Sequence, residues 1–264
     1  MENGIKTSTR RNRSLAYMMK KHLPQRLFIA HRGFSARYPE NTLAAFNGAI
    51  DAGAHMIELD VCLSMDRHLV VIHDETVDRT TNGTGSVKML TLAQLSQLDA
   101  GSWFDPRFNA ERLPTLDQVL DAVKGHLQVN IEIKPEAFEE EGPADAVERQ
   151  VLDLVREKNM LDDVLVSSFE WQALENLRKL EPRIALGLLS EVPVDENLLH
   201  WYRRIKGFSW HPDFRVLTRQ QVDSLHDLGA RVFPYAVDGR IDSLGMLAMG
   251  VDGLIVDDPR QMTA

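Results

Sequence analysis

From about residue 116 onward, the chain alternates regularly between short apolar runs and longer segments whose apolar residues have helical spacing. This alternation predicts strands joined by helices, which is the pattern of a parallel sheet covered by helices. We expect strands in this part of the chain at residues 127–133, 164–168, 184–188, 207–210, 231–235 and 253–256. We expect helices at residues 116–123, 144–159, 171–180, 196–204, 218–228 and 241–249.

Three more apolar runs precede this part of the chain, at residues 26–31, 56–61 and 69–72. Only residues 64–68 separate the second run from the third, whereas a parallel crossover needs a dozen residues or more. We therefore predict an antiparallel hairpin with its turn near Asp66. In that register His73 lies roughly opposite Leu59, which places it close to Glu58 and Asp60.

The number of parallel strands decides the architecture. Without the second hairpin strand, eight remain, which is the count of a (β/α)8 TIM barrel, and 264 residues suit that fold. No glycine-rich dinucleotide fingerprint follows the first strand, which argues against a doubly wound nucleotide-binding sheet. Residues 74–112 are polar and contain glycines, and we expect them to form a small inserted segment, as a lid or substrate wall.

Charge is distributed unevenly along the chain. The net charge is -9, but residues 1–22 contain six Lys or Arg and one Glu, or +5, which leaves -14 for residues 23–264. The acidic remainder, which we expect to be the barrel domain, argues against a nucleic-acid partner. We expect residues 1–22 to be a flexible basic tail, with a weak contact to an anionic surface as the alternative.

Cysteine content and hydropathy bear on location. The single cysteine, Cys62, excludes an internal disulfide framework and indicates a reducing compartment, so we expect a cytoplasmic protein. No apolar run approaches 18 residues, so we expect no stable membrane insertion. The sequence does not indicate an oligomeric state.

Three acidic residues lie on two predicted strands that should be neighbours. Glu58 and Asp60 are two residues apart on one strand, so both side chains are on one face, and Glu132 is on the next parallel strand. Three carboxylates at one barrel mouth repel each other unless a cation neutralises them. A ligand set made only of oxygen favours one divalent cation, Mg²⁺ or Ca²⁺, over zinc.

Two histidines end predicted strands in the same region. His31 and His73 titrate near neutral pH, so a pair can divide acid and base work. Asp74, beside His73, could orient that imidazole or only begin the loop. His211 ends a later strand and is an outside candidate, because a lone histidine is more often a core or surface group.

Cations accompany the acids. Arg32 follows His31, and Lys134 is two residues beyond Glu132, so both could bind a phosphoryl group or pair with the carboxylates. We also predict a helix from Thr42 to about Gly53, capped by Asn41 or Thr42. Glu40, just before this helix, could brace Arg32 or His31, or only favour the helix N-terminus.

The ordered set of motifs resembles the glycerophosphodiester phosphodiesterase family, in its bacterial cytoplasmic form. Each motif alone is weak, but together they span residues 27–260 in order. The matching residues are His31-Arg32-Gly33, Pro39-Glu40-Asn41-Thr42, Glu58-Leu59-Asp60-Val61, His73-Asp74, Glu132-Ile133-Lys134 and Asp252-Gly253-Leu254-Ile255-Val256-Asp257-Asp258-Pro259.

The resemblance implies a TIM barrel that uses a divalent cation to hydrolyse glycerophosphodiesters to glycerol 3-phosphate and an alcohol. By position it makes His31 and His73 the acid and base, and Arg32 and Lys134 the phosphate contacts. It makes metal ligands of the three acids, Glu58, Asp60 and Glu132. Family members often have a tryptophan where this chain has Tyr235, so Tyr235 is expected on the substrate side.

Two alternatives stay open at this point. One is a lysophospholipid or phosphoinositol phosphodiesterase on the same scaffold, which would need an apolar entrance. The other is a barrel that binds phosphate or metal without catalysis, although the presence of both histidines and all three acids argues against it.

Overall fold

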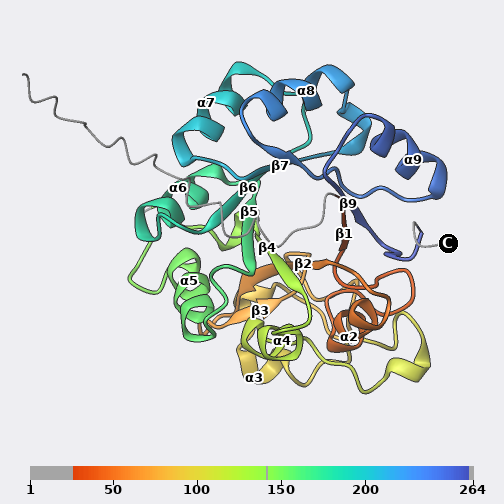
Figure 1. Cartoon of the computed structure of the whole chain (residues 1–264). Helices are drawn as coiled ribbons and strands as arrows, with labels where there is room; N and C mark the ends of the chain where they lie inside the picture. Colours follow the sequence, from red (N-terminus) through yellow and green to blue (C-terminus); the bar gives the residue numbers. More distant parts are fainter. Residues whose placement is uncertain (1–25, 141, 262–264) are drawn as a thin grey trace, which may run out of the picture.

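The strands of the computed structural model, which describes residues 26–140 and 142–261, form one sheet in the order β8-β7-β6-β5-β4-β2-β1-β9, with β3 paired to β2. Backbone N–H groups of Asp252 and Ile255 donate to the carbonyls of Val232 (3.1 Å) and Pro234 (3.0 Å), which joins the two ends of that order. The sheet therefore closes into a ring with helices outside it (Figure 1). The basic tail predicted for residues 1–22 lies outside the described residues.

The eight strands other than β3 pair in parallel, as the TIM barrel prediction requires. The strands are β1 Leu27–Ala30, β2 Met56–Leu63, β3 Leu69–Val71, β4 Gln128–Ile133, β5 Val164–Ser168, β6 Ala185–Ser190, β7 Ser209–Pro212, β8 Arg231–Val232 and β9 Gly253–Val256. The helices are α2 Leu43–Asp51, α3 Leu92–Leu95, α4 Leu116–Val123, α5 Val147–Glu157, α6 Trp171–Leu180, α7 Glu196–Ile205, α8 Arg219–Asp227 and α9 Arg240–Ala248.

The hairpin of β2 and β3 is antiparallel, with Val61 opposite Val71 and Leu63 opposite Leu69. Extended by two residues, this register puts His73 across from Leu59, as predicted. Strand β8 is shorter than predicted: the Tyr235 N–H still donates to the Pro212 carbonyl at 2.9 Å, but Pro212 and Pro234 lack the N–H groups that a regular ladder needs.

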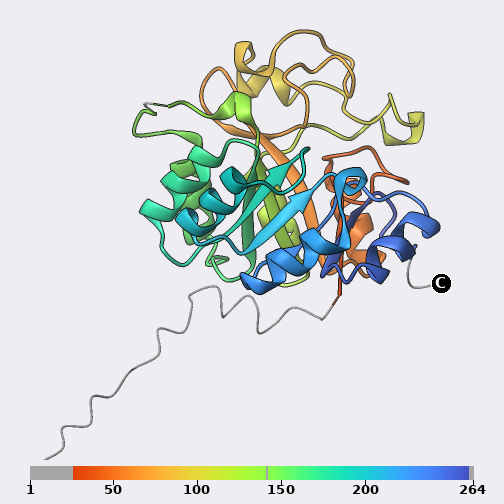
Figure 2. The ribbon, with the colours of Figure 1, turned by 90° about the horizontal axis from the view of Figure 1, so that it is seen from above.

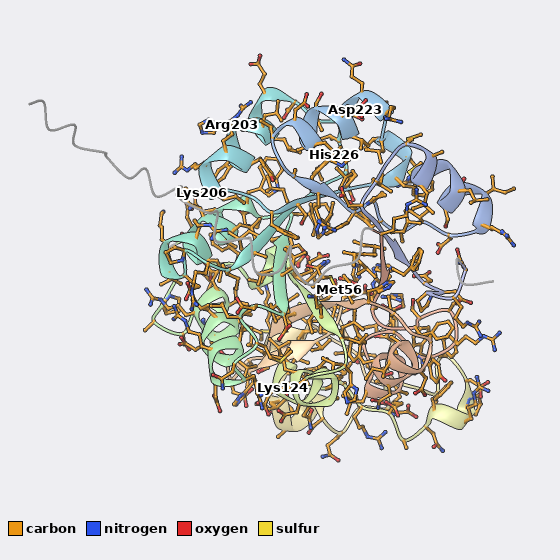
Figure 3. All side chains as sticks on the ribbon, viewed as in Figure 1. Met56, Lys124, Arg203, Lys206, Asp223 and His226 are labelled. Atoms are coloured by element: carbon orange, nitrogen blue, oxygen red, sulfur yellow. The ribbon has the colours of Figure 1, made fainter. Side chains whose placement is uncertain are left out.

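Two hydrophobic layers stabilise the barrel. One lies between the strands and the helices, whose buried faces include Phe46, Leu120 and Val151. The other fills the barrel interior below the polar site, and Met56, labelled in Figure 3, belongs to it. Its members are Leu27, Ile29, Met56, Leu165, Ala185, Phe208, Phe233 and Ile255. The filled interior makes this barrel a packed core, so chemistry is confined to the strand ends.

Residues 74–112 gather at one end of the barrel, where Figure 2 shows them in orange to yellow. They have a small hydrophobic cluster of their own, in which Val77, Val87 and Leu95 pack against Cys62 and Ile72 of the hairpin. Burial raises the pKa of the Cys62 thiol well above its usual range, so this cysteine acts as a packing residue. Among the described residues, every helix is too short or too polar to cross a bilayer.

Candidate active site

The chain leaves β1 through a tight reversal at His31-Arg32-Gly33. Arg32 has a φ of +52° and Gly33 a φ of +82°, which is the left-handed region. A Cβ on residue 33 would lie 2.7 Å from the backbone of Ala45, so only glycine fits there. The unusual backbone of Arg32 lets its N–H donate to Glu58 Oε2 at 2.9 Å, which fastens the end of β1 to β2.

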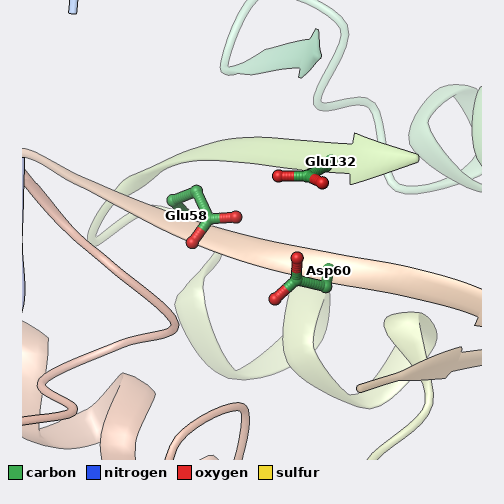
Figure 4. Close-up of side chains that lie close together, drawn as sticks. All are labelled: Glu58, Asp60 and Glu132. Atoms are coloured by element: carbon green, nitrogen blue, oxygen red, sulfur yellow. The ribbon is translucent and has the colours of Figure 1, made fainter. Parts of the chain in front are cut away.

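Glu58, Asp60 and Glu132 point into the barrel mouth from neighbouring strands (Figure 4). Asp60 lies directly opposite Glu132 in the parallel register of β2 and β4. All three are buried, and one carboxylate oxygen from each lies within 4.8 Å of the others. The predicted acidic cluster is therefore present as one group.

Crowding of these acids alters their protonation. Burial and the charge of Asp60 raise the pKa of Glu58 to about 8 and that of Glu132 to about 7. Burial alone would also raise the pKa of Asp60, but Arg32 and Lys134 outweigh it and lower that pKa. Three buried oxygen donors that resist ionisation together fit a cation, which would favour their charged forms.

Both predicted cations border the acids. Lys134 Nζ donates to Glu132 Oε1 at 2.9 Å and lies 3.6 Å from Asp60 Oδ1. Arg32 Nε lies 3.6 Å from Asp60 Oδ2. Asp60 Oδ2 also accepts a hydrogen bond from Asn41 Nδ2 at 2.9 Å. Asn41 was predicted only as a possible cap of the following helix, but the cap of α2 is Thr42.

The two histidines have the same kind of partner. His31 Nδ1 lies 2.7 Å from Asp257 Oδ1, and His73 Nδ1 lies 2.7 Å from Asp74 Oδ1. Because a carboxylate only accepts hydrogen bonds, Nδ1 carries the proton in both rings, and Nε2 is the nitrogen that the carboxylate does not engage.

The pKa values of these histidines move in opposite directions. Burial would lower the pKa of His31, but the Asp257 hydrogen bond and the charge of Glu58 outweigh it and raise that pKa. Burial lowers the pKa of His73, and the charge of Asp60 only partly offsets this effect. Unequal environments of this kind suit a pair that shares acid and base work.

Asp257 was not assigned a role from sequence. It follows β9, which pairs with β1 along its length, and Ser35 Oγ also donates to its Oδ1 at 3.0 Å. The available signal was barrel closure, because the last strand of a closed barrel must lie beside the first. Residues just after β9 therefore face residues just after β1.

Glu40 braces Arg32, which was one of its predicted roles: Arg32 Nη1 donates to Glu40 Oε1 at 2.8 Å. Arg79, also missed in the sequence, donates both to Glu40 and to Asp74. Its position in the polar 74–112 segment gave no sign of this contact.

Of the remaining candidates, His211 lies on β7, and Tyr235 lies three residues beyond the end of β8, where it pairs with Asp213. His211 is fully buried, bonds through Nε2 to Ser209 Oγ at 2.8 Å, and has its pKa lowered by burial to about 3. It is a neutral core histidine. Tyr235 packs edge-on against Phe169, with ring centroids 6.1 Å apart, and its hydroxyl donates to the Ser190 carbonyl at 3.4 Å.

Comparison with known proteins identifies the family. The model of the glycerophosphoryl diester phosphodiesterase family matches residues 31–261, which includes every residue of the site. The chain belongs to this family. A glycerophosphodiester phosphodiesterase of Caldanaerobacter subterraneus is 42% identical over 89% of this chain and 96% of its own length. A Bacillus subtilis enzyme of the same name is 32% identical over 88% of this chain and 84% of its own length.

Solved structures of phosphodiesterases have the same fold. A phosphodiesterase of Oleispira antarctica, in complex with the product sn-glycerol-3-phosphate, matches with a TM-score of 0.85 at 31% identity. The match covers 93% of this chain and 97% of that one. A glycerophosphodiester phosphodiesterase of Agrobacterium tumefaciens matches with a TM-score of 0.77 at 30% identity, over 89% of this chain and 97% of that one.

Proposed function

We propose that this chain hydrolyses glycerophosphodiesters to sn-glycerol 3-phosphate and an alcohol, as a step in glycerophospholipid degradation. The observation that carries the proposal is the convergence of two carboxylate-held histidines and two cations on one buried acidic cluster. The Oleispira phosphodiesterase with bound sn-glycerol-3-phosphate supports the identity of the product.

Glu58, Asp60 and Glu132 would hold one divalent cation, Mg²⁺ or Ca²⁺. When bound, it would neutralise the acids and offset the charge that grows on the phosphate oxygens in the transition state. The donor set consists only of carboxylate oxygens, which suits these two ions.

Arg32 and Lys134 would bind the phosphate oxygens. Both side chains are mostly buried, and each forms an ion pair with a carboxylate. Glu40 pairs with Arg32, and Glu132 pairs with Lys134. Cations held in place before substrate arrives need little rearrangement as charge develops. Tyr235, which packs edge-on against Phe169, would provide an aromatic surface for the glycerol side of the substrate.

His31 and His73 would move the protons. Each has Nδ1 committed to a carboxylate, so Nε2 is the reactive nitrogen. One imidazole removes a proton from the attacking hydroxyl group or water, and the other protonates the oxygen of the leaving alcohol.

Substitution of the histidines tests this function. His31→Ala and His73→Ala should each lower kcat for glycerophosphocholine by about 10²–10⁴-fold, the usual contribution of acid–base catalysis. His200→Ala, an exposed histidine on α7, serves as the matched control and should keep full activity. Near-full activity in both active-site variants would rule out the assignment.

A further inference from the structure

Arg79, in the 74–112 segment, binds two site carboxylates at once. Its Nε and Nη2 donate to Asp74 Oδ2 (2.6 Å) and Oδ1 (3.0 Å). Its Nη1 and Nη2 donate to Glu40 Oε2 (2.8 Å) and Oε1 (2.8 Å). One guanidinium group therefore forms a bidentate pair with each carboxylate, which fixes their distance and orientation.

Each of these two carboxylates also binds another group of the proposed site. Asp74 Oδ1 also binds His73 Nδ1, and Glu40 Oε1 also binds Arg32 Nη1. An unbroken chain of contacts thus runs from His73 through Asp74, Arg79 and Glu40 to Arg32. Arg79 is its central member and joins the hairpin end to the loop that follows β1.

We propose that Arg79 is a positioning residue, which orients His73 through Asp74 and Arg32 through Glu40. The 74–112 segment would then contribute to the reaction by fixing the positions of His73 and Arg32 relative to each other. This inference rests on the proposed hydrolytic function, because it assigns Arg79 to the same reaction.

This role requires the planar guanidinium group of an arginine. A lysine ammonium is a point charge and cannot form two planar bidentate pairs. Without a cation between them, Asp74 and Glu40 would repel each other, and His73 and Arg32 would lose their fixed orientation. Misplacement of reacting groups by about 1 Å can cost 10²-fold in rate.

Contacts other than those of Arg79 hold the segment together. Val77 and Val87 are buried in its hydrophobic cluster, and their backbone N–H groups donate to Gly85 and Glu75. Thr81 Oγ1 donates to the Val77 carbonyl at 2.6 Å. Loss of a half-exposed guanidinium should therefore leave the segment in place, so that activity and folding can be separated.

The test uses Arg79→Met and Arg79→Lys in the full-length protein, with glycerol 3-phosphate release from glycerophosphocholine as the assay. Arg107→Met is the control, because Arg107 lies in the same segment but contacts Asp105 and the Phe108 ring. We expect both Arg79 variants to lower kcat by about 10–100-fold with a Tm within about 2 °C of wild type. The control should match wild type.

A double-mutant cycle with Asp74→Asn shows whether Arg79 acts through its partner. The loss in kcat for the double variant should be clearly smaller than the product of the two single losses, because both substitutions break the contact that holds His73, while only the loss of Arg79 also breaks the contact with Glu40. Fully multiplicative losses would overturn the proposal. Full activity in Arg79→Lys would also overturn the proposal, since a positive charge alone would then suffice. If Arg79→Met unfolds, the activity of Arg79→Lys decides whether Arg79 is a positioning residue.

The wild-type protein separates this inference from the function on which it rests. An active wild type with an equally active Arg79→Met variant would contradict only the positioning role. A wild type that releases no glycerol 3-phosphate would contradict the proposed function itself.

Discussion

The backbone N–H of Arg32 donates to the Glu58 carboxylate at 2.9 Å, so the proposed phosphate contact and a proposed metal ligand are tied together. This bond depends on the left-handed conformation of Arg32 and on the glycine that follows it. The same carboxylate lies against Asp60 and Glu132, which raises its pKa to about 8. The Glu58 carboxylate would thus serve metal binding at the expense of the stability of the metal-free protein, and this effect can be measured.

Glu58→Gln should stabilise the metal-free protein at pH 8.5 while abolishing activity. The folded-state pKa of about 8 is above the ordinary value of 4.5, so the folded protein binds more protons between these values. The stability contribution of Glu58 is therefore lost as pH rises through this window, and glutamine removes that effect. Thermal unfolding in EDTA should show a Tm increase of about 2–4 °C for each 1 kcal/mol gained.

Glu136→Gln is the control for that experiment, because Glu136 is an exposed acid just beyond the end of β4. It should change neither the Tm nor its pH dependence. A Glu58→Gln variant that is less stable than wild type at pH 8.5 without metal would contradict the account of a repulsive acidic cluster.

Asp257→Asn should lower kcat by about 10-fold or more, as part of the roughly 10²–10⁴-fold contribution of acid–base catalysis. The substitution removes the charge that favours protonated His31 and weakens the hold on its Nδ1 proton. Steady-state kinetics will measure the loss. Asp258→Asn is the matched control, since Asp258 binds Arg260 instead, and equal losses in the two variants would refute the specific role of Asp257.

The barrel fold and most residues of the site could be predicted from the sequence, because they follow from patterns that are local in the chain. Strand and helix periodicity gave the parallel repeat, and the five-residue connection at residues 64–68 forced the hairpin that brings His73 to the acids. Glu58, Asp60 and Glu132 could be grouped because alternation along a strand and adjacency of strands are local rules.

Asp257 and Arg79 could not be assigned in that way. The contact of Asp257 with His31 spans 226 positions and exists only because the barrel closes. Arg79 lies in an irregular segment with no period, so nothing local indicates which way its side chain points. The predicted strand at residues 231–235 is also too long, because Pro212 and Pro234 lack N–H groups for the ladder.

Arg178→Met should destabilise the protein by about 2–4 kcal/mol without changing kcat. Arg178 donates to the carbonyls of Ile205 (2.7 Å), Pro182 (2.5 Å) and Ile184 (2.8 Å), so its loss leaves several half-buried acceptors unpaired. Urea unfolding will measure the difference. Arg203 is at an exposed α7 position labelled in Figure 3, and the unfolding free energy of Arg203→Met should stay within about 0.5 kcal/mol of wild type. Equal effects of the two substitutions would show that the hydrogen bonds from Arg178 to the three carbonyls are not the cause.

Glu175→Gln should cost about 1 kcal/mol at pH 7, an amount reduced by the solvent exposure of its partner Arg204. The hydrogen bond from Arg204 lowers the pKa of Glu175 from 4.5 to about 2. A depressed folded-state pKa gives stability above pH 4.5 that is lost as pH falls toward 2. Urea unfolding at pH 7 and pH 3 should therefore show a smaller difference from wild type at the lower pH.

The control for Glu175 is Asp223→Asn, an exposed i,i+4 partner of Arg219 on α8. It should change stability by less than about 0.5 kcal/mol at either pH. A Glu175→Gln effect that is constant from pH 7 to pH 3 would show that packing, and not the charge pair, is responsible.

The most direct test of the central claim is a coupled assay of glycerol 3-phosphate release from several glycerophosphodiester head groups. The wild-type protein would be treated with EDTA and then given Mg²⁺ or Ca²⁺. We predict that EDTA reduces release to background and that one of the two ions restores it, with no recovery in Glu132→Gln. Release that persists in EDTA, or no release under any of these conditions, would contradict a metal-dependent phosphodiesterase.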